Sequence, residues 1–264
     1  MNLNLTDKVV IITGGAKGIG AGCVEVFAAE GAIPVIVGRS PVVGEALLDS
    51  CGEAGARGIF IEAELTSEEA CKNAIAVTLE KYGRIDGIVH NAGINDGVKL
   101  SDSPENFMAS LQKNIFHVFT LTHYALGALK KSKGFIINIS SKVAETGQGA
   151  TSGYAASKGA MNALTREWAL DLAQYSIRVN AVVPAEVMTP LYEQWLNTLE
   201  DSDKALREIE ARIPFERRMT TSREIANAVA FLASDKSSHT TGQIIYPDGG
   251  YVHLDRSYGS VEKS

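Results

Sequence analysis

The sequence is poor in cysteine, has no excess of positive charge and contains no long hydrophobic run. Its three cysteines, Cys23, Cys51 and Cys71, are an odd number without the spacing of metal ligands. We therefore expect no metal site and interpret them as small packing residues of a reducing compartment. The net charge of −6 argues against a role on nucleic acids or anionic membranes. Since neither a membrane span nor a signal peptide is recognisable, we expect a soluble, cytoplasmic protein.

Short apolar segments alternate with longer amphipathic ones, which predicts an α/β fold with a parallel sheet covered on both faces. The expected strands are 8–13, 33–38, 58–63, 85–90, 135–140 and 177–183, and the expected helices are 18–30, 41–55, 67–82, 105–131 and 153–174. With 264 residues, 45% of them hydrophobic, one domain over residues 1–264 is the simplest account. Residues 190–213 leave the alternation, and we expect a small helical substrate lid there. An ordinary surface helix pair is the alternative.

A tyrosine and a lysine stand four residues apart in an expected helix, so Tyr154 and Lys158 share one helix face. A unit charge about 4 Å from the phenol is worth roughly 4 kcal/mol at an effective dielectric of about 20. That is about three pKa units, enough to bring the tyrosine pKa near neutral, where a general acid/base works best. Ser141 ends an expected strand, so its hydroxyl can hold a substrate oxygen against the tyrosine. Such pairs also arise by chance, so further motifs are needed.

A glycine-rich loop follows the first expected strand and opens the first expected helix. Gly14, Gly18 and Gly20 permit a tight turn and a close approach of the backbone to a pyrophosphate, with Lys17 and Ile19 between them. The strand–loop–helix context is the one that a dinucleotide-binding motif requires. The alternative is a purely structural glycine turn.

The end of the second expected strand decides which dinucleotide is favoured. A carboxylate there would hold the ribose hydroxyls and repel a 2′-phosphate, but the residues are Gly38, Arg39 and Ser40. Lys17 can approach the same place. Two cations and a hydroxyl suit a 2′-phosphate, so we predict NADP, with NAD possible if both cations only face solvent.

Two further segments are expected around the cofactor. Glu64 and Leu65 close the third strand, where the adenine would lie. Asn91, Ala92 and Gly93 follow the fourth strand, and their small side chains leave room for the cofactor. A polar residue inside the expected helix 105–131 either faces solvent or, if it is buried, bends the helix or holds a water. This residue is Asn114.

Six motifs stand in the order and approximate spacing of the short-chain dehydrogenase/reductase family, which the chain resembles from about residue 5 to 254. They are the TGxxxGxG loop, Asn91-Ala92-Gly93, Asn114, Ser141, Tyr154-xxx-Lys158 and Pro184-xxxx-Thr189. The resemblance implies a single Rossmann-like domain with a doubly wound parallel sheet of about seven strands. It also implies a nicotinamide cofactor.

The resemblance further implies a catalytic tetrad. Tyr154 would be the acid/base, and Ser141 would fix the substrate oxygen. Lys158 would lower the pKa of the phenol and bind the nicotinamide ribose, while Asn114 would position a water that links this lysine to solvent.

The loop after the sixth strand is implied to touch the nicotinamide carboxamide through Val187 and Thr189. Ala185 replaces the family's common glycine after Pro184. The same loop carries Glu186, which is either a carboxylate of the substrate pocket or an exposed loop residue. Two more departures concern cofactor positions: a histidine where the family often has asparagine (His90), and a glutamate where it usually has aspartate (Glu64).

Substrate residues are expected at the carboxyl ends of the strands and in the lid, namely Asn95, Asp96, Thr146, Gln148, Glu186, Tyr192 and Trp195. Amides, carboxylates and two aromatic rings suit a polyhydroxylated ligand, because each hydroxyl needs a partner and the apolar face of a sugar stacks on a ring. Residues 184–192 and 239–256 resemble the L-fucose dehydrogenase branch of the family, whose members oxidise the anomeric carbon of an aldose to a lactone.

Two other functions remain open. An NADPH-dependent ketone or 3-oxoacyl reductase is one, and Lys130, Lys131 and Lys133 would then meet an acidic carrier protein, unless they are simply a solvated helix end. A cofactor-binding regulator without turnover is the other, and the intact tetrad argues against it.

The resemblance also implies a homotetramer built on the helix after Tyr154 and on the C-terminal strand. That helix carries small residues that permit close helix–helix approach: Ala155, Ala156, Gly159, Ala160 and Ala163. Packing within one subunit would explain the same residues.

Overall fold

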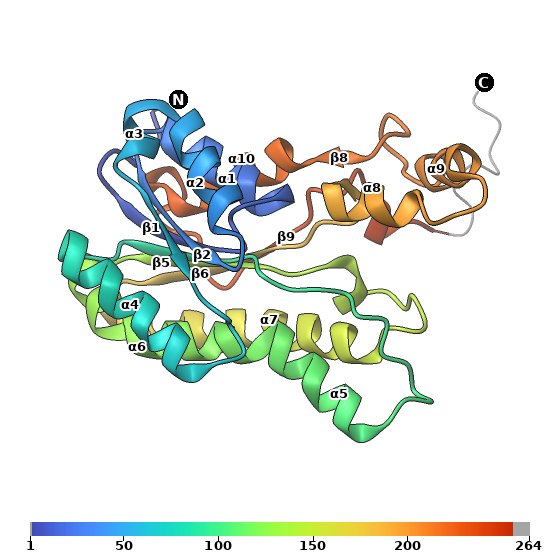
Figure 1. Ribbon diagram of the computed structural model, residues 1–264, viewed down its shortest axis with the longest axis horizontal. Helices are drawn as coiled ribbons and strands as arrows, with labels where there is room; N and C mark the ends of the chain where they lie inside the picture. The colour runs from blue at the N-terminus through green and yellow to red at the C-terminus, as the bar shows by residue number, and fades with distance from the viewer. Residues whose placement is uncertain (1, 256–264) are drawn as a thin grey trace.

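A seven-stranded parallel sheet lies at the centre of the computed structural model, which describes residues 2–255 (Figure 1). Its order is β3-β2-β1-β4-β5-β6-β9. The strands are β1 (Val9–Thr13), β2 (Ile33–Gly38), β3 (Ile59–Glu62), β4 (Gly87–His90), β5 (Phe135–Ile139), β6 (Arg178–Val182) and β9 (Ile244–Ile245). The predicted α/β fold and parallel sheet are confirmed. Arg256, at the end of the segment 239–256, lies outside the described residues.

The strands are apolar throughout because both faces of the sheet are covered. In β1, Val10 and Ile12 point into one core, whereas Val9 and Ile11 point into the core on the opposite face. All four are at most 1% exposed.

Helices cover the two faces in two groups, as a doubly wound sheet requires (Figure 1). One face carries α1 (Gly18–Ala29) and α10 (Ser222–Ala233), with α2 (Pro41–Ser50) and the short α3 (Gly52–Ala56) nearby. The other face carries α4 (Glu68–Tyr82), α6 (His117–Ser132) and α7 (Ser152–Asp171).

The helix expected over 105–131 is interrupted. It consists of α5 (Pro104–Leu111), a π-helical turn over Gln112–Phe116 and α6. Asn114 lies inside this turn and is fully buried. Its Nδ2 donates to the carbonyl oxygen of Ser110 at 3.0 Å. A buried polar side chain therefore coincides with the widened turn, as expected for a functional helix irregularity.

Two helices project beyond the sheet where a substrate lid was expected. After the short strand β7 (Val187–Met188), the chain forms α8 (Pro190–Leu196) and α9 (Ser202–Glu210), then returns through β8 (Thr220–Thr221), which pairs with β7 (Figure 1). The predicted helical excursion is confirmed.

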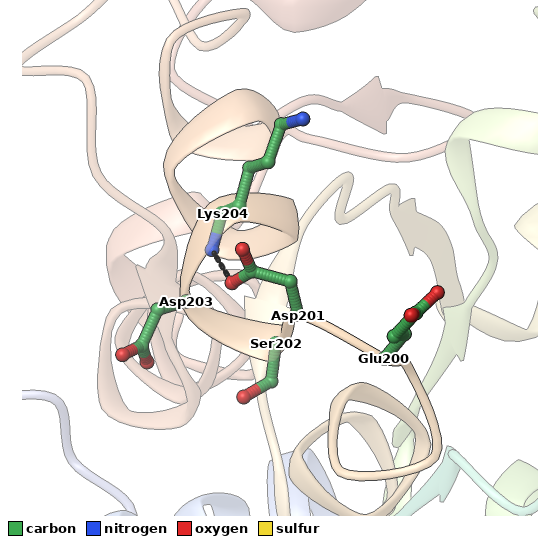
Figure 2. Close-up of a pocket in the computed structure, with 5 residues that line it drawn as sticks. All are labelled: Glu200, Asp201, Ser202, Asp203 and Lys204. Atoms are coloured by element: carbon green, nitrogen blue, oxygen red, sulfur yellow. Dashed lines mark hydrogen bonds between the residues drawn. The ribbon is translucent and has the colours of Figure 1, made fainter.

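A surface hollow lies at the start of α9 and is lined by residues 200–204 (Figure 2). The carboxylate of Asp201 accepts a hydrogen bond from the backbone nitrogen of Lys204 at 2.9 Å. This is an ordinary helix cap, and none of the tetrad residues lines the hollow.

The cysteines are packing residues, as expected. Cys23 and Cys71 are fully buried in opposite cores. Burial raises the pKa of Cys23 to about 12 and that of Cys71 to about 11. Within residues 2–255, no helix is long and apolar enough to cross a membrane.

Candidate active site

The glycine-rich loop forms a cradle from backbone atoms. Gly14 and Gly18 adopt φ values of +64° and +56°, which favour glycine. A β-carbon on Gly20 would lie 2.3 Å from the carbonyl oxygen of Gly14. The Nδ2 of Asn91 donates to the carbonyl oxygens of Thr13 at 3.0 Å and Gly14 at 3.2 Å. These two hydrogen bonds therefore tie the loop to the segment that follows β4.

The cradle also has the charge distribution that a pyrophosphate needs. Lys17 precedes α1, makes no side-chain cap, and is followed by a first turn without acidic residues. The first N–H groups of α1 thus keep their positive field, and Lys17 adds an exposed cation. Ile19 is partly buried against the core. The residues present fit a bound dinucleotide.

Two segments that were predicted to surround the cofactor meet at the glycine loop. A β-carbon on Gly14 would lie 3.1 Å from the Cα of Ala92, and one on Gly18 would lie 3.3 Å from the Cβ of Thr189. The Asn91–Gly93 segment and the loop beginning at Pro184 therefore both border the cradle.

The charged residues predicted for the adenosine end lie at the surface. Arg39 pairs with Glu64 at 3.7 Å between Nη1 and Oε2, and these side chains are 76% and 52% exposed. Ser40 precedes α2 without capping it, while Leu65 is buried in the core. Both cations of the predicted 2′-phosphate site face solvent, and one of them shares its charge with a carboxylate.

The predicted acid/base pair shares a helix face. On α7, the Nζ of Lys158 lies 5.5 Å from the ring centroid of Tyr154. The phenol is hydrogen-bonded to the hydroxyl of Ser141. The Lys158 ammonium is 2% exposed and donates to the carbonyl oxygen of Ile139 at 2.7 Å. Strand β5, the loop after it and helix α7 thus bring three members of the tetrad together.

Burial shifts the pKa values of Tyr154 and Lys158 away from those expected from their spacing. It raises the pKa of Tyr154, and the hydrogen bond from Ser141 only partly opposes this. It lowers the pKa of Lys158 to about 7, so the amine is only partly charged at neutral pH. The predicted near-neutral phenol is therefore wrong for these side chains by themselves, because desolvation outweighs the hydrogen bond from Ser141.

Asn114, the fourth member, borders the same space. Its Oδ1 accepts from the backbone nitrogen of Ile94 at 2.7 Å. A β-carbon on Gly93 would lie 2.9 Å from this oxygen and 3.5 Å from the Nζ of Lys158. A side chain at Gly93 would therefore collide with the amide oxygen next to the amine.

A buried polar cluster lies next to Ser141. Lys142 and Glu186 form an ion pair, and their side chains are 13% and 11% exposed. The hydroxyl of Tyr192 donates to Glu186 at 2.8 Å, and burial followed by this carboxylate raises the tyrosine pKa. The Lys142 ammonium also lies 4.3 Å from the ring centroid of Tyr251, while Trp195 packs edge-on against Tyr192 at 5.2 Å. Glu186 is thus not an exposed loop residue.

Sequence reasoning missed Lys142 and Tyr251. Lys142 directly follows the predicted catalytic serine, and its position was the one available signal. Tyr251 is sixty-five residues beyond Glu186, and only the folded chain brings its ring to Lys142.

The other predicted substrate residues make no hydrogen bonds to the side chains of this cluster. Asn95 accepts from the hydroxyl of Thr151. Asp96 accepts from the hydroxyl of Ser110 at 2.7 Å and pairs with Lys113, which fixes α5. Two more lie in the loop after β5, where the Thr146 hydroxyl donates to a backbone carbonyl and Gln148 is exposed.

A family model described as enoyl-(acyl carrier protein) reductase matches residues 14–252. The chain belongs to the short-chain dehydrogenase/reductase family. It is 36% identical to an L-fucose dehydrogenase from Bos taurus, over 99% of this chain and 96% of that protein. It is 37% identical to a 3-oxoacyl-[acyl-carrier-protein] reductase from Thermotoga maritima, over 95% of this chain and all of that protein.

Solved structures give the same family. The crystal structure of Cj0485 dehydrogenase matches with a TM-score of 0.94 and 44% identity, over 97% of this chain and 98% of that one. Ligand-free aldohexose dehydrogenase from Thermoplasma acidophilum matches with a TM-score of 0.86 and 31% identity over both complete chains. As a short-chain dehydrogenase/reductase, the protein is an oxidoreductase that acts with a nicotinamide cofactor.

Proposed function

We propose that this short-chain dehydrogenase/reductase oxidises the C1 hydroxyl of an aldose such as L-fucose to the corresponding lactone. The observation that carries the reaction type is Tyr154, hydrogen-bonded to Ser141 and backed by a buried Lys158. The relatives named for L-fucose and aldohexose support the substrate class.

Tyr154 accepts the proton of the C1 hydroxyl in this proposal. The C1–O bond becomes a carbonyl as C1 loses its hydrogen with the bonding electrons, and the ring oxygen makes the product a lactone. When bound, an oxidised nicotinamide would supply the acceptor for that hydride. Ser141 donates to the substrate oxygen, and Lys158 stabilises the phenolate that precedes proton transfer. Because burial alone raises the pKa of Tyr154, the reaction depends on keeping positive charge close to its oxygen.

Substrate hydroxyls bind the cluster of Lys142, Glu186 and Tyr192 in the proposed complex. A carboxylate accepts two hydroxyl hydrogens well, and a buried ammonium next to it donates to a third oxygen. Trp195 offers an exposed ring face for the apolar side of the sugar. Tyr192 and Trp195 lie on α8, so α8 and α9 serve as the substrate lid.

The cofactor would be held by the backbone cradle and its neighbours. Gly14, Lys17 and Gly18 would bind the pyrophosphate, with Ile19 and Gly20 shaping the first turn of α1. The nicotinamide end would lie beside Ala92, Gly93, Lys158 and the loop containing Pro184, Val187 and Thr189.

NADP is the proposed form of the cofactor. The support is chemical: Arg39, Ser40 and Lys17 offer two cations and a hydroxyl, and Arg39 is 76% exposed and accessible to a phosphate. Titration of the purified protein with NADPH and NADH, followed by nicotinamide fluorescence, tests this, with Arg39→Asp as the variant that should reverse the preference. A wild-type protein that binds NADH more tightly overturns the proposal.

The reaction is tested with a panel of aldoses, polyols and ketones in the presence of either cofactor. We expect turnover of L-fucose or a related aldose, and a loss of about 10²–10⁴-fold in kcat for Tyr154→Phe without a change in melting temperature. If that variant keeps full activity, the protein does not use this mechanism. If the wild type turns over none of these compounds and Tyr154→Phe has no effect in cells where the gene is required, a regulator without turnover becomes the better account.

A 3-oxoacyl reductase is the second candidate, favoured by the Thermotoga relative. Of the three lysines near the end of α6, Lys130 lies 3.8 Å over the ring of Tyr175 and is already engaged. Turnover of acetoacetyl thioesters in preference to L-fucose would establish this second function.

The assembly and location are also proposals. Helix α7 exposes small residues, and Phe119 of α6 and Leu170 of α7 are 58% and 80% exposed. These apolar side chains support the proposed homotetramer, which light scattering tests directly.

The three free thiols support a cytoplasmic location.

A further inference from the structure

Two fully buried histidines lie next to the candidate active site and take no part in the mechanism above. His90 ends β4 and His117 begins α6, and both are 0% exposed. Their ring centroids are 6.4 Å apart. Buried imidazoles are normally hydrogen-bonded through both nitrogens or through one nitrogen and a water.

The hydrogen bonds determine the tautomer of His90. Its Nε2 lies 2.9 Å from the hydroxyl oxygen of Thr122. That hydroxyl donates its own hydrogen to the carbonyl oxygen of Val118 at 2.7 Å, so it accepts from His90. The proton of the neutral ring is therefore on Nε2, and Nδ1 presents a lone pair.

Among the described residues, Nδ1 of His90 has no hydrogen-bond partner, and the two nitrogens of His117 have at most one, the backbone of Ala92. The carbonyl of Ala92 is the backbone group that favours protonation of His117. Ala92 adjoins Gly93, and a β-carbon on Gly93 would lie 2.9 Å from the amide oxygen of Asn114 and 3.5 Å from the Nζ of Lys158. The Ala92–Gly93 segment thus connects His117 to the surroundings of Lys158.

Charge interactions connect the same groups. Burial, followed by the charge of Lys158, lowers the pKa of His117 to about 4, while Glu64 opposes this shift. Burial lowers the pKa of His90 well below its ordinary value, with His117 and Lys158 contributing. Both rings are therefore neutral at working pH, and Lys158 is the base of this group that becomes protonated.

We propose that His117 and His90 are positioning residues for the reaction, which hold an internal water between their free ring nitrogens and so provide the polar surroundings that sustain the Lys158 ammonium. A neutral imidazole accepts a hydrogen bond but does not repel an ammonium, unlike a second cation. This inference depends on the proposed acid/base role of Tyr154 and Lys158, but not on the identity of the sugar.

The test is the pH dependence of kcat/KM for the best aldose at saturating cofactor, measured for His117→Leu, His117→Asn and the wild type. Leucine removes the polar partner, so the ammonium becomes harder to form and the alkaline limb should move to lower pH by about one unit. Asparagine can still hold a water, so His117→Asn should move the alkaline limb by no more than about a third of that shift. His123→Leu, an exposed histidine of the same helix, is the control and should leave the profile unchanged.

A merely structural role predicts a different pattern. Replacing an unpaired buried ring by leucine would then raise the melting temperature and leave the pH profile unchanged, and this result overturns the inference. If His117→Leu does not fold, His90→Leu carries the same prediction for the alkaline limb. An active Tyr154→Phe variant would overturn the proposed function itself, whereas an inactive one with an unchanged His117→Leu profile overturns only the histidine inference.

Discussion

The cofactor half and the substrate half of the candidate site are built in different ways. Around the first four strands, the cradle consists of backbone atoms that glycines leave accessible, and its charged side chains, Arg39 and Glu64, are more than half exposed. Around Ser141, the site consists of side chains, and its charges are buried: Lys142 and Glu186 are little exposed, and Lys158 is 2% exposed.

The cofactor half therefore depends mainly on shape, and the substrate half depends mainly on electrostatics. A backbone cradle is fixed by chain geometry, so it tolerates changes in surface charge but not an added methyl group. A cluster of buried charges tolerates modest changes in shape, but each charge depends on its partner, because a lone charge in a low dielectric is expensive. Four substitutions test this contrast.

The largest effect should come from Gly20→Ala in the cradle. Its β-carbon would lie 2.3 Å from a backbone carbonyl oxygen, so the loop must move. We expect a loss of at least about 3 kcal/mol in unfolding free energy and no measurable cofactor binding by fluorescence titration. Gly127→Ala in α6 is the matched control, because its β-carbon meets nothing within 4 Å. It should stabilise the protein by about 0.5–1 kcal/mol. Equal effects of the two changes would contradict the cradle.

Glu186→Gln should have the next largest effect, in the substrate half. The amide can still accept from Tyr192 but leaves Lys142 buried without its counter-charge. We expect a loss of about 3 kcal/mol in urea unfolding and a raised KM for the sugar. The double variant with Lys142→Met should recover most of the stability but not the KM. If Glu186→Gln is as stable as the wild type, the ion pair is not buried in the working protein.

Lys158→Met should stabilise the protein while abolishing its activity. The folded-state pKa of about 7 lies below the ordinary value of 10.5, so the unfolded chain binds a proton more readily than the folded one between these values. The wild type therefore bears the full penalty of the buried charge below pH 7 and loses it towards pH 10.5. We expect a gain of about 2–3 kcal/mol at pH 6 that largely disappears at pH 10, measured by chemical unfolding. A gain that is independent of pH would contradict this explanation.

The smallest effect on stability should come from Glu64→Gln at the adenosine end. Because this ion pair with Arg39 is exposed, unfolding should change by less than about 0.5 kcal/mol. The released guanidinium should bind a 2′-phosphate more strongly, so the Kd for NADPH should fall about threefold while that for NADH stays constant. Arg39→Gln is the complementary control and should weaken NADPH binding alone.

The sequence predicted the sheet and the shared helix face of Tyr154 and Lys158 well, because both follow from local patterns. Apolar runs set the strands, and the helical spacing of Tyr154 and Lys158 sets their common face. It could not predict that burial would raise the tyrosine pKa, since desolvation depends on all surrounding elements. Glu186 remained ambiguous for the same reason: its charge partner, Lys142, is 44 residues away in the sequence and meets it only in the folded chain.

The π-helical turn at Gln112–Phe116 also has a consequence for evolution by insertion and deletion. One additional residue in a helix rotates everything before it by about 100° relative to everything after it. Here α5 packs on α7 while α6 packs on α4, so the two parts of the interrupted helix have different packing partners. Removing a single residue from the turn would restore an unbroken helix, yet it would bring the wrong face of α5 onto α7. The number of residues in this segment is therefore constrained, and descendants of this chain can vary its sequence far more freely than its length.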